Sequence, residues 1–219
     1  MSPDKMMAGE VDQFYLKYFK DKFRQFGDTP QGVDWKDKES QVRRFKYIMD
    51  TIQFSFPSLK SFSVMEVGCG YGAFFEFLKA TEMNNDIAYF GIDLVDEMVT
   101  EAAIKYPELK NNLYVGEFKS FSFGSKYDVV ISSGIFNVKG HIDDSTFEKH
   151  IFHTVELMFA LCEKGIFFNL MTPSPSFKDP KLYYPAMDVL FDFICRKLGR
   201  KMTIVTSYPL WEITVGILK

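Results

Sequence analysis

The chain has 219 residues, of which 47% are hydrophobic and 17% are aromatic. This length and composition predict a folded domain with a sizeable core and exclude a chain that is disordered over most of its length. Its 26 basic and 29 acidic residues give a net charge of −3. That charge disfavours nucleic acid as a partner, because no basic field attracts a polyanion.

Cysteine usage and the distribution of apolar residues indicate a cytoplasmic protein. Cys69, Cys162 and Cys195 lie far apart and lack the spacing of a zinc site or a disulfide framework, so we expect reduced thiols. The chain begins without the apolar run of a secretory signal, and no uncharged apolar stretch approaches the roughly 18 residues of a membrane span. We therefore expect neither export nor a membrane partner.

Two helical patterns open the chain. Residues 9–26 and 36–53 carry apolar side chains at helical spacing, and Pro57 ends this unit. We expect residues 1–56 to form a helical cap or lid rather than a separate domain. The open mouth of a sheet offers a surface on which the apolar side chains of these segments can pack. These side chains are Phe14, Tyr18, Trp35 and Phe45.

Strand and helix patterns alternate over the rest of the chain, residues 57–219. Strands are predicted at 61–69, 88–94, 112–118, 127–135 and 165–172, and helices at 71–83, 95–106, 145–162 and 182–198. Strands separated by crossovers of helix length predict an α/β fold with a doubly wound parallel sheet. Residues 203–219 hold two further strand patterns around Tyr208 and Pro209, close enough to pair antiparallel.

The strongest motif is a glycine-rich turn between the first of these strands and the next helix. It reads Glu66-Val67-Gly68-Cys69-Gly70-Tyr71-Gly72-Ala73. Glycines let a backbone turn tightly and approach a ligand, and the spacing also fits the dinucleotide fingerprint loosely. The carboxylate of Glu66 would repel a phosphate there, and can instead organise the loop amides or meet a ligand ammonium.

Acidic residues close the next two strands. Asp93 is placed to accept two hydrogen bonds from a ribose diol, a feature that NAD-binding proteins share. Glu117 follows Gly116 and can accept from an adenine amine, while Phe118 covers the ring.

Together these residues resemble the class I S-adenosylmethionine-dependent methyltransferases. The matching segments are E-V-G-C-G-Y-G at 66–72, G-I-D-L at 91–94, G-E-F at 116–118 and Y-D-V-V-I-S-S-G-I-F at 127–136. Stretches within 32–45, 134–138 and 182–184 also resemble a bacterial subgroup of unassigned substrate. The resemblance implies a Rossmann-like seven-stranded sheet of order 3-2-1-4-5-7-6 with the last strand antiparallel. It also implies S-adenosylmethionine as cofactor and S-adenosylhomocysteine as product.

The resemblance further implies which residues hold the cofactor. The glycine-rich turn would line its methionine part, Asp93 its ribose and Leu94 its adenine, with Ser133 and Gly134 near the amino group and methyl. Arg44 borders the apolar face of the second helix and can reach the cofactor carboxylate, with a surface ion pair as the alternative. The expected cofactor-binding residues are Glu66, Gly68, Cys69, Gly70, Tyr71, Asp93, Leu94, Glu117, Phe118, Ser133, Gly134 and Arg44.

The methyl acceptor is expected beyond the carboxyl ends of the strands. His141, near the end of the fourth strand, is the candidate general base, with a solvated loop histidine as the alternative. Methyl transfer needs little acid–base help, because the sulfonium is a strong electrophile and alignment supplies much of the rate. The substrate candidates are Trp35, Asn137, Tyr183 and Tyr184.

Two further patterns bear on the acceptor and on metals. The fourth strand ends in S-S-G-I-F-N, unlike the (N/D)PP(Y/F) of family members that methylate adenine or glutamine amides. We therefore expect a small-molecule acceptor methylated on oxygen or nitrogen. Asp143-Asp144 precedes a predicted helix and indicates a helix N-cap, so no metal is expected.

Two alternative functions remain at this point. One is a non-catalytic protein that binds S-adenosylmethionine, and the other is an NAD(P)-dependent oxidoreductase with the same glycine-rich loop. Thermal shift with S-adenosylmethionine against NAD(P) separates the second from an S-adenosylmethionine-dependent enzyme. The sequence leaves the acceptor, its pathway, a general base and the oligomeric state open.

Overall fold

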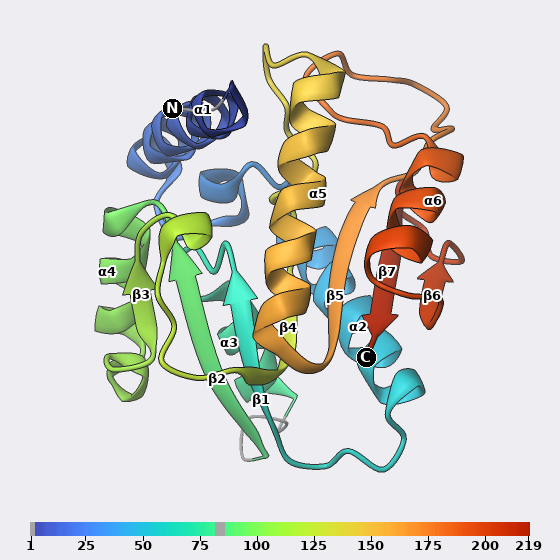
Figure 1. The fold of residues 1–219 in the computed structure, drawn as a ribbon. Helices are drawn as coiled ribbons and strands as arrows, with labels where there is room; N and C mark the ends of the chain where they lie inside the picture. The colour runs from blue at the N-terminus through green and yellow to red at the C-terminus, as the bar shows by residue number, and fades with distance from the viewer. Residues whose placement is uncertain (1–2, 82–85) are drawn as a thin grey trace.

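A central seven-stranded sheet organises the computed structural model, which describes residues 3–81 and 86–219 (Figure 1). Its strand order is β3-β2-β1-β4-β5-β7-β6, which confirms the predicted order. The strands are β1 (Phe62–Val67), β2 (Ile87–Asp93), β3 (Leu113–Val115), β4 (Tyr127–Ser132), β5 (Cys162–Met171), β6 (Met202–Val205) and β7 (Glu212–Leu218). The first five strands pair in parallel, and β7 runs antiparallel to both β5 and β6.

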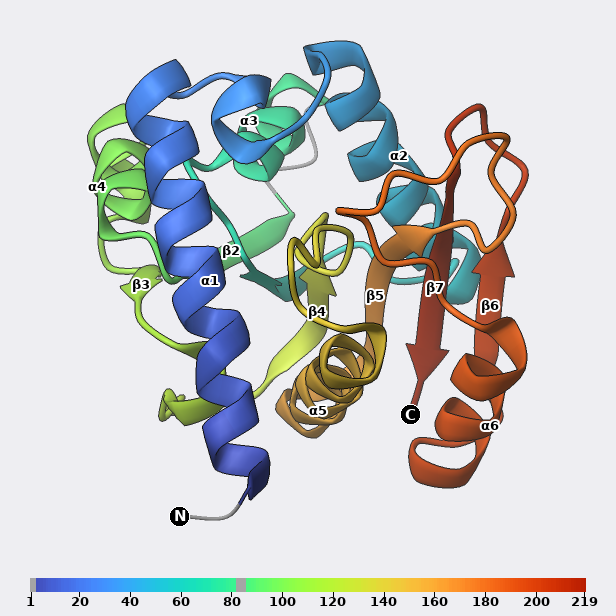
Figure 2. The same cartoon turned by 90° about the horizontal axis from the view of Figure 1, so that it is seen from above.

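Helices cover both faces of the sheet, as the view from above shows (Figure 2). One face carries α2 (Lys38–Ser55) and α3 (Ala73–Ala80), and the other carries α5 (Asp144–Leu161) and α6 (Met187–Lys197). Among the described residues, the other helices are α1 (Pro3–Phe26) and α4 (Asp96–Lys105), with short 3₁₀ turns η1 (Pro30–Val33), η3 (Pro107–Leu109) and η4 (Phe118–Ser120). None of the described helices is long and apolar enough to cross a membrane.

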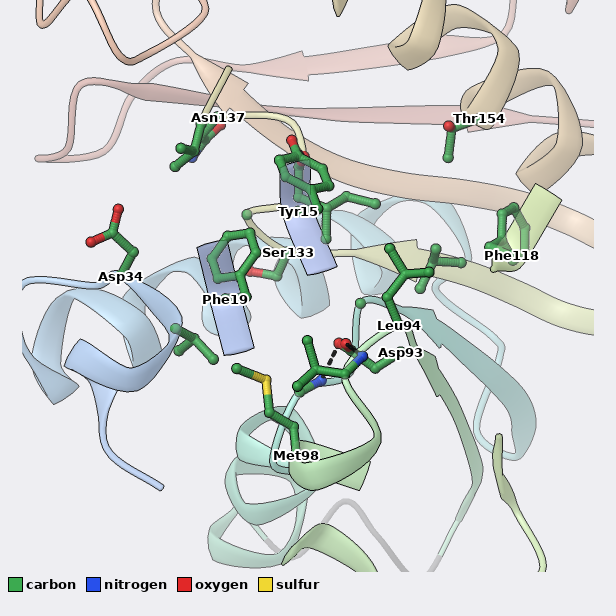
Figure 3. Close-up of a pocket in the computed structure, with 18 of the residues that line it drawn as sticks. Tyr15, Phe19, Asp34, Asp93, Leu94, Met98, Phe118, Ser133, Asn137 and Thr154 are labelled. Atoms are coloured by element: carbon green, nitrogen blue, oxygen red, sulfur yellow. Dashed lines mark hydrogen bonds between the residues drawn. The ribbon is translucent and has the colours of Figure 1, made fainter. Parts of the chain in front are cut away.

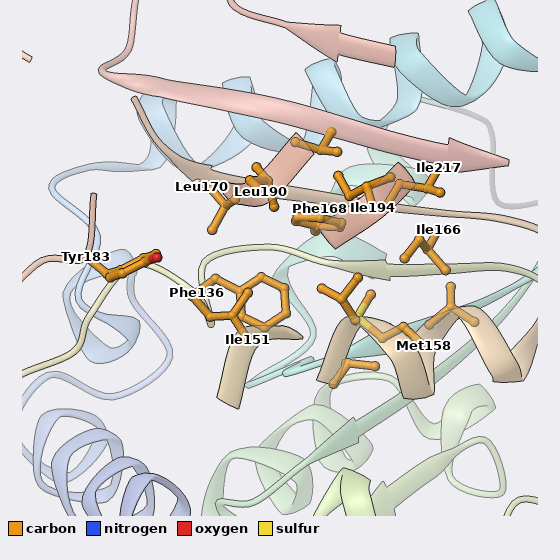
Figure 4. Packing of buried hydrophobic residues seen from close by; sticks show 14 of the residues in the cluster. Phe136, Ile151, Met158, Ile166, Phe168, Leu170, Tyr183, Leu190, Ile194 and Ile217 are labelled. Carbon is orange, nitrogen blue, oxygen red and sulfur yellow. The ribbon is translucent and has the colours of Figure 1, made fainter. Parts of the chain in front are cut away.

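The core follows from alternation along buried strands. In β5, Ile166, Phe168 and Leu170 face α5 and α6, while Phe167 faces α2 and α3. Aromatic rings fill much of this volume, and Phe136 meets Phe168 edge to face at a centroid distance of 5.5 Å (Figure 4). Burying one such side chain contributes roughly 1.5–3 kcal/mol to folding, so both layers are firmly held to the sheet.

Local sequence signals explain several of the element ends. Asp143 caps α5 by accepting a hydrogen bond from the Thr146 backbone N–H at 3.0 Å, which confirms the predicted N-cap at Asp143-Asp144. The helix predicted from residue 182 begins only at Met187, because Pro185 disfavours helical geometry in the residue before it. Strand β3 ends at Val115 because Gly116 adopts a φ of 150°.

Two helices also differ in length from the prediction. Helix α1 begins at Pro3, whereas the predicted helix began at residue 9. Helix α3 ends at Ala80 with Thr81 as its cap, whereas the prediction extended to residue 83. Residues 82 and 83 lie outside the described part of the chain.

Candidate active site

A cavity of about 320 Å³ opens beyond the carboxyl ends of β1, β2 and β4 (Figure 3). The carboxyl ends of these parallel strands lie side by side there, and the loops that follow them line the cavity, as expected for a ligand site in such a sheet. The wall is mainly apolar, and a few polar side chains project into it, a composition typical of small-molecule sites.

The glycine-rich turn forms the floor of this cavity. Gly68 and Gly70 both have positive φ angles, 81° and 52°. A Cβ on Gly68 would lie 2.2 Å from Cγ2 of Ile135, so this glycine lets the loop after β4 approach closely. A Cβ on Gly70 would instead project between Val33 and Met98, which both line the cavity. Gly70 therefore keeps ligand space open.

Asp93 joins the turn to α4 from the end of β2. Its carboxylate accepts hydrogen bonds from the backbone N–H groups of Gly70 at 2.8 Å and Val95 at 2.9 Å (Figure 3). Burial raises the pKa of this carboxyl, and the hydrogen bonds from Val95 and Gly70 oppose that rise. Each oxygen keeps a second lone pair, so the anchored carboxylate can still accept from two ligand hydroxyls.

Leu94, Met98 and Phe118 add apolar surface to the cavity beside Asp93. Figure 3 shows Leu94 and Phe118 on the same side of the cavity as Asp93. Apolar side chains of this kind can pack against the faces of a flat ring. Glu117 is not among the lining residues, and its carboxylate accepts from the Ser120 hydroxyl at 3.2 Å instead.

Three predicted cofactor residues lie behind the turn rather than in the cavity wall. Glu66 is buried on the α2–α3 face, where it accepts a hydrogen bond from the Tyr89 hydroxyl at 2.5 Å. Burial raises the pKa of Glu66 to about 8. The side chain of Tyr71 shares a buried hydrogen bond with Gln41, and Cys69 is buried beside Gly91. These side chains support the turn from behind.

A polar group that sequence reasoning missed lies between α1, η4 and α5. Asp12 pairs with Lys119 at 2.5 Å, and the Lys119 ammonium lies 3.3 Å from Nδ1 of His150. Burial lowers the pKa of His150 to about 3 and raises that of Asp12 to about 6. All three residues line the cavity. The sequence did contain a signal for Asp12, because helical spacing places it on the same face of α1 as Tyr15 and Phe19, which also line the cavity.

Asn137 projects into the cavity from the loop after β4 (Figure 3). It is only 2% exposed, and neither its amide nitrogen nor its amide oxygen has a hydrogen-bond partner among the described residues. The hydroxyl of Ser133 is also buried without such a partner in the described chain. Because buried polar groups are normally hydrogen-bonded, this part of the wall fits a polar ligand.

His141, Tyr183 and Tyr184 are not among the residues that line the cavity. His141 is exposed and meets Phe14 edge to face at 5.1 Å. The Tyr183 hydroxyl donates to Glu148 at 2.7 Å, and the Tyr184 hydroxyl accepts from the Asp179 backbone N–H at 2.8 Å. All three lie in segments that surround the mouth of the sheet, but none contributes to its lining.

The N-terminal segment contributes to the cavity in two ways. Helix α1 and residues 33–36 line it directly, through side chains that include Tyr15, Phe19 and Trp35. Helix α2 instead packs its apolar face, including Phe45 and Ile48, on the sheet. Only Arg44 of α2 reaches the cavity, where its buried guanidinium pairs with Glu212. This pairing replaces the surface ion pair considered from the sequence.

Comparisons with known proteins agree with this arrangement. The model of the family described as "Methyltransferase domain" matches residues 64–156. A Mycobacterium tuberculosis protein named "Putative methyltransferase Rv1506c" is 31% identical over 163 residues, covering 72% of this chain and 93% of the relative. Malonyl-(acyl-carrier protein) O-methyltransferase 1 of Ilyobacter polytropus is 27% identical over 194 residues, covering 85% and 69%.

A solved structure shows the same fold over nearly the whole chain. Magnesium protoporphyrin IX methyltransferase from Synechocystis PCC 6803, with bound S-adenosylhomocysteine, superposes with a TM-score of 0.64 at 15% identity. The superposition covers 96% of this chain and 99% of the other. The N-terminal segment is thus included in the structural likeness.

Proposed function

The chain belongs to the methyltransferase family, and we propose that it transfers a methyl group from S-adenosylmethionine to an oxygen or nitrogen atom of a small molecule. One observation carries this proposal. Gly70, which leaves room for a ligand beside its backbone, and Asp93, whose carboxylate accepts a hydrogen bond from the Gly70 N–H, lie next to each other in the cavity wall. This arrangement fits a ligand whose ribose binds the Asp93 carboxylate while the neighbouring part of the ligand lies against the Gly70 backbone.

The residues present fit S-adenosylmethionine along the length of the cavity. Gly68 and Gly70 would lie against the methionine part, and Asp93 would accept from the ribose hydroxyls. Leu94 and Phe118 would hold the adenine faces, which supports their predicted roles. Ser133 and Gly134 line the wall toward Asn137 and would lie near the methionine amino group. S-adenosylhomocysteine is then the product that the same residues hold.

We propose that acceptor binding falls to Asn137 and Trp35. The free donor and acceptor of the Asn137 amide can orient a hydroxyl, carboxyl or amide group of the acceptor. The indole of Trp35 and the surrounding apolar wall exclude water from the reacting atoms. The sulfonium supplies the electrophilic methyl, so orienting the acceptor is the main task of the side chains. An oxygen acceptor finds support in the relative named as an O-methyltransferase.

We further propose that α1 and residues 33–36, within the predicted 1–56 cap, cover the cavity as a lid. Their side chains supply part of the cavity wall, including Tyr15, Phe19 and Trp35. A cytoplasmic location is supported by the three cysteines, which are all free.

The function is tested with methyl-labelled S-adenosylmethionine and a fractionated extract of small metabolites. We expect label to enter a small-molecule fraction with the wild-type enzyme and not with Asn137→Ala. Binding of S-adenosylhomocysteine by Asn137→Ala should stay close to that of the wild type. Binding without label transfer across such fractions would favour a non-catalytic binding protein.

A further inference from the structure

Arg44, Asn169 and Glu212 form a buried hydrogen-bonded chain at one end of the cavity. They come from α2, β5 and β7 and are 8%, 1% and 3% exposed. The Glu212 carboxylate accepts from Arg44 Nε at 2.7 Å and from a second guanidinium nitrogen through the same oxygen. Its other oxygen accepts from Nδ2 of Asn169.

Trp35 and Gly134 close this series of hydrogen bonds into a ring of five residues. Asn169 Oδ1 accepts from the Gly134 backbone N–H at 2.9 Å. The guanidinium carbon of Arg44 lies 3.8 Å from the centre of the Trp35 ring. The indole of Trp35 covers Gly134 so closely that a Cβ on Gly134 would lie 2.2 Å from Cζ2 of the indole. Four of the five residues line the cavity.

We propose that Glu212 and Asn169 are positioning residues, which act through Arg44 to hold Trp35 against Gly134 and so shape the wall around the methyl group. The inference rests on the proposed function, because it assigns that wall to S-adenosylmethionine and its acceptor. It links the lid segment to strands β5 and β7, which lie far from the glycine-rich turn in the sequence. No local motif marks either residue.

The direction of the hydrogen bonds makes the proposal specific. A carboxylate at position 212 only accepts, so Asn169 must turn its NH₂ toward it and its oxygen toward Gly134. In Glu212→Gln, an oxygen facing Arg44 leaves an NH₂ facing the NH₂ of Asn169. Turning the Asn169 amide over relieves that contact but sets a donor against the Gly134 N–H. Either arrangement disturbs the wall.

Exchanging the amide and the carboxylate between positions 169 and 212 restores the direction of every hydrogen bond. In the double variant N169D/E212Q, the amide oxygen at 212 accepts from Arg44 and its NH₂ donates to the carboxylate at 169. That carboxylate still accepts from the Gly134 N–H, and the total charge is unchanged. A positioning role through hydrogen-bond direction therefore predicts that the double variant recovers what each single variant loses.

The test measures S-adenosylhomocysteine binding by calorimetry for the wild type, Glu212→Gln, Asn169→Asp and the double variant. We expect each single variant to bind at least tenfold more weakly and the double variant to come within threefold of the wild type. Arg43→Ala is the matched control, since Arg43 pairs with Glu39 on the exposed side of the same helix, and should bind within twofold. Wild-type affinity in both single variants, or a double variant as weak as the worse single one, would overturn the proposal.

Trp35 fluorescence gives a readout that does not depend on the cofactor. In a Trp211→Phe background Trp35 is the remaining tryptophan, and its emission should shift in each single variant and return in the double variant. Unchanged emission would reject the ring. If the wild type fails to bind S-adenosylhomocysteine while the emission behaves as expected, the proposed function fails and the ring stands. Should a single variant not fold, Trp35→Phe leaves the ion pair intact and should still weaken binding at least fivefold; wild-type binding there would count against the proposal.

Discussion

Replacing Asp93 with alanine removes an acceptor from two backbone N–H groups and from the proposed ribose hydroxyls. The bonds from Gly70 and Val95, at 2.8 and 2.9 Å, should each contribute on the order of 1 kcal/mol or more. We expect the free energy of unfolding to fall by about 2–4 kcal/mol on this basis. Loss of two charge-assisted bonds to ribose should cost about 2–4 kcal/mol of binding, or roughly 30- to 1000-fold in affinity for S-adenosylhomocysteine.

Asp128→Ala is the matched control for this change. Its carboxylate accepts from the backbone N–H and hydroxyl of Ser63 at 2.9 and 3.0 Å, where β1 and β4 begin and away from the cavity. Urea unfolding should show a loss of stability in both variants, whereas calorimetry should show weakened binding only in Asp93→Ala. Unchanged affinity in folded Asp93→Ala would refute the ribose assignment. An equal loss in Asp128→Ala would mean that general destabilisation explains the effect.

Three further variants test particular residues. Gly70→Val should abolish binding of S-adenosylhomocysteine in calorimetry, since its side chain enters the cavity; Gly27→Val, with a similar φ of 63° and nothing within 4 Å, should bind normally, and equal effects would contradict the cavity assignment. Burial raises the pKa of Glu66 from 4.5 to about 8, so the folded state keeps a proton that the unfolded state releases, and stability falls as pH rises through that window. Glu66→Gln should remove this fall and be more stable than the wild type at pH 8 by about 2–4 kcal/mol in urea unfolding; a less stable variant would show that the charge is needed. Burial lowers the pKa of His150 from 6.5 to about 3, so protons bind the unfolded state preferentially and stability is lost as pH falls below 6.5. His150→Gln should flatten this loss by up to about 1.4 kcal/mol per pH unit, and parallel curves for the two proteins would contradict a neutral buried imidazole.

The alternation of strand and helix patterns predicted the α/β sheet, and the resemblance to the methyltransferases implied its strand order, which the structure confirms. Asp93 could be placed from its position at the end of a predicted strand, because the carboxyl ends of parallel strands meet at one edge. Leu94 and Ser133 were implied by the resemblance to the methyltransferases. Alternation along β1 could also have placed Glu66, since Val64 and Glu66 share a face that packs on α2 and α3. The motif at residues 66–72 instead indicated that Glu66 contacts the cofactor, whereas the alternation along β1 correctly indicates a buried position.

Other parts of the site depend on contacts distant in sequence. Arg44 and Glu212 are separated by 168 residues, and only the packing of α2 against β7 brings them together. The spacing within α2 placed Arg44 at the border of the apolar face but could not identify its partner. The same holds for Asp12, whose place in the cavity depends on how α1 crosses toward α5.

The most direct measurement is a calorimetric titration of the wild-type chain with S-adenosylhomocysteine, with NAD⁺ titrated under the same conditions. We expect one molecule of S-adenosylhomocysteine to bind per chain, NAD⁺ to give no heat of binding, and Gly70→Val to lose the signal. Binding of NAD⁺ in preference to S-adenosylhomocysteine, or S-adenosylhomocysteine binding that survives in Gly70→Val, would contradict a methyltransferase cofactor site in this cavity.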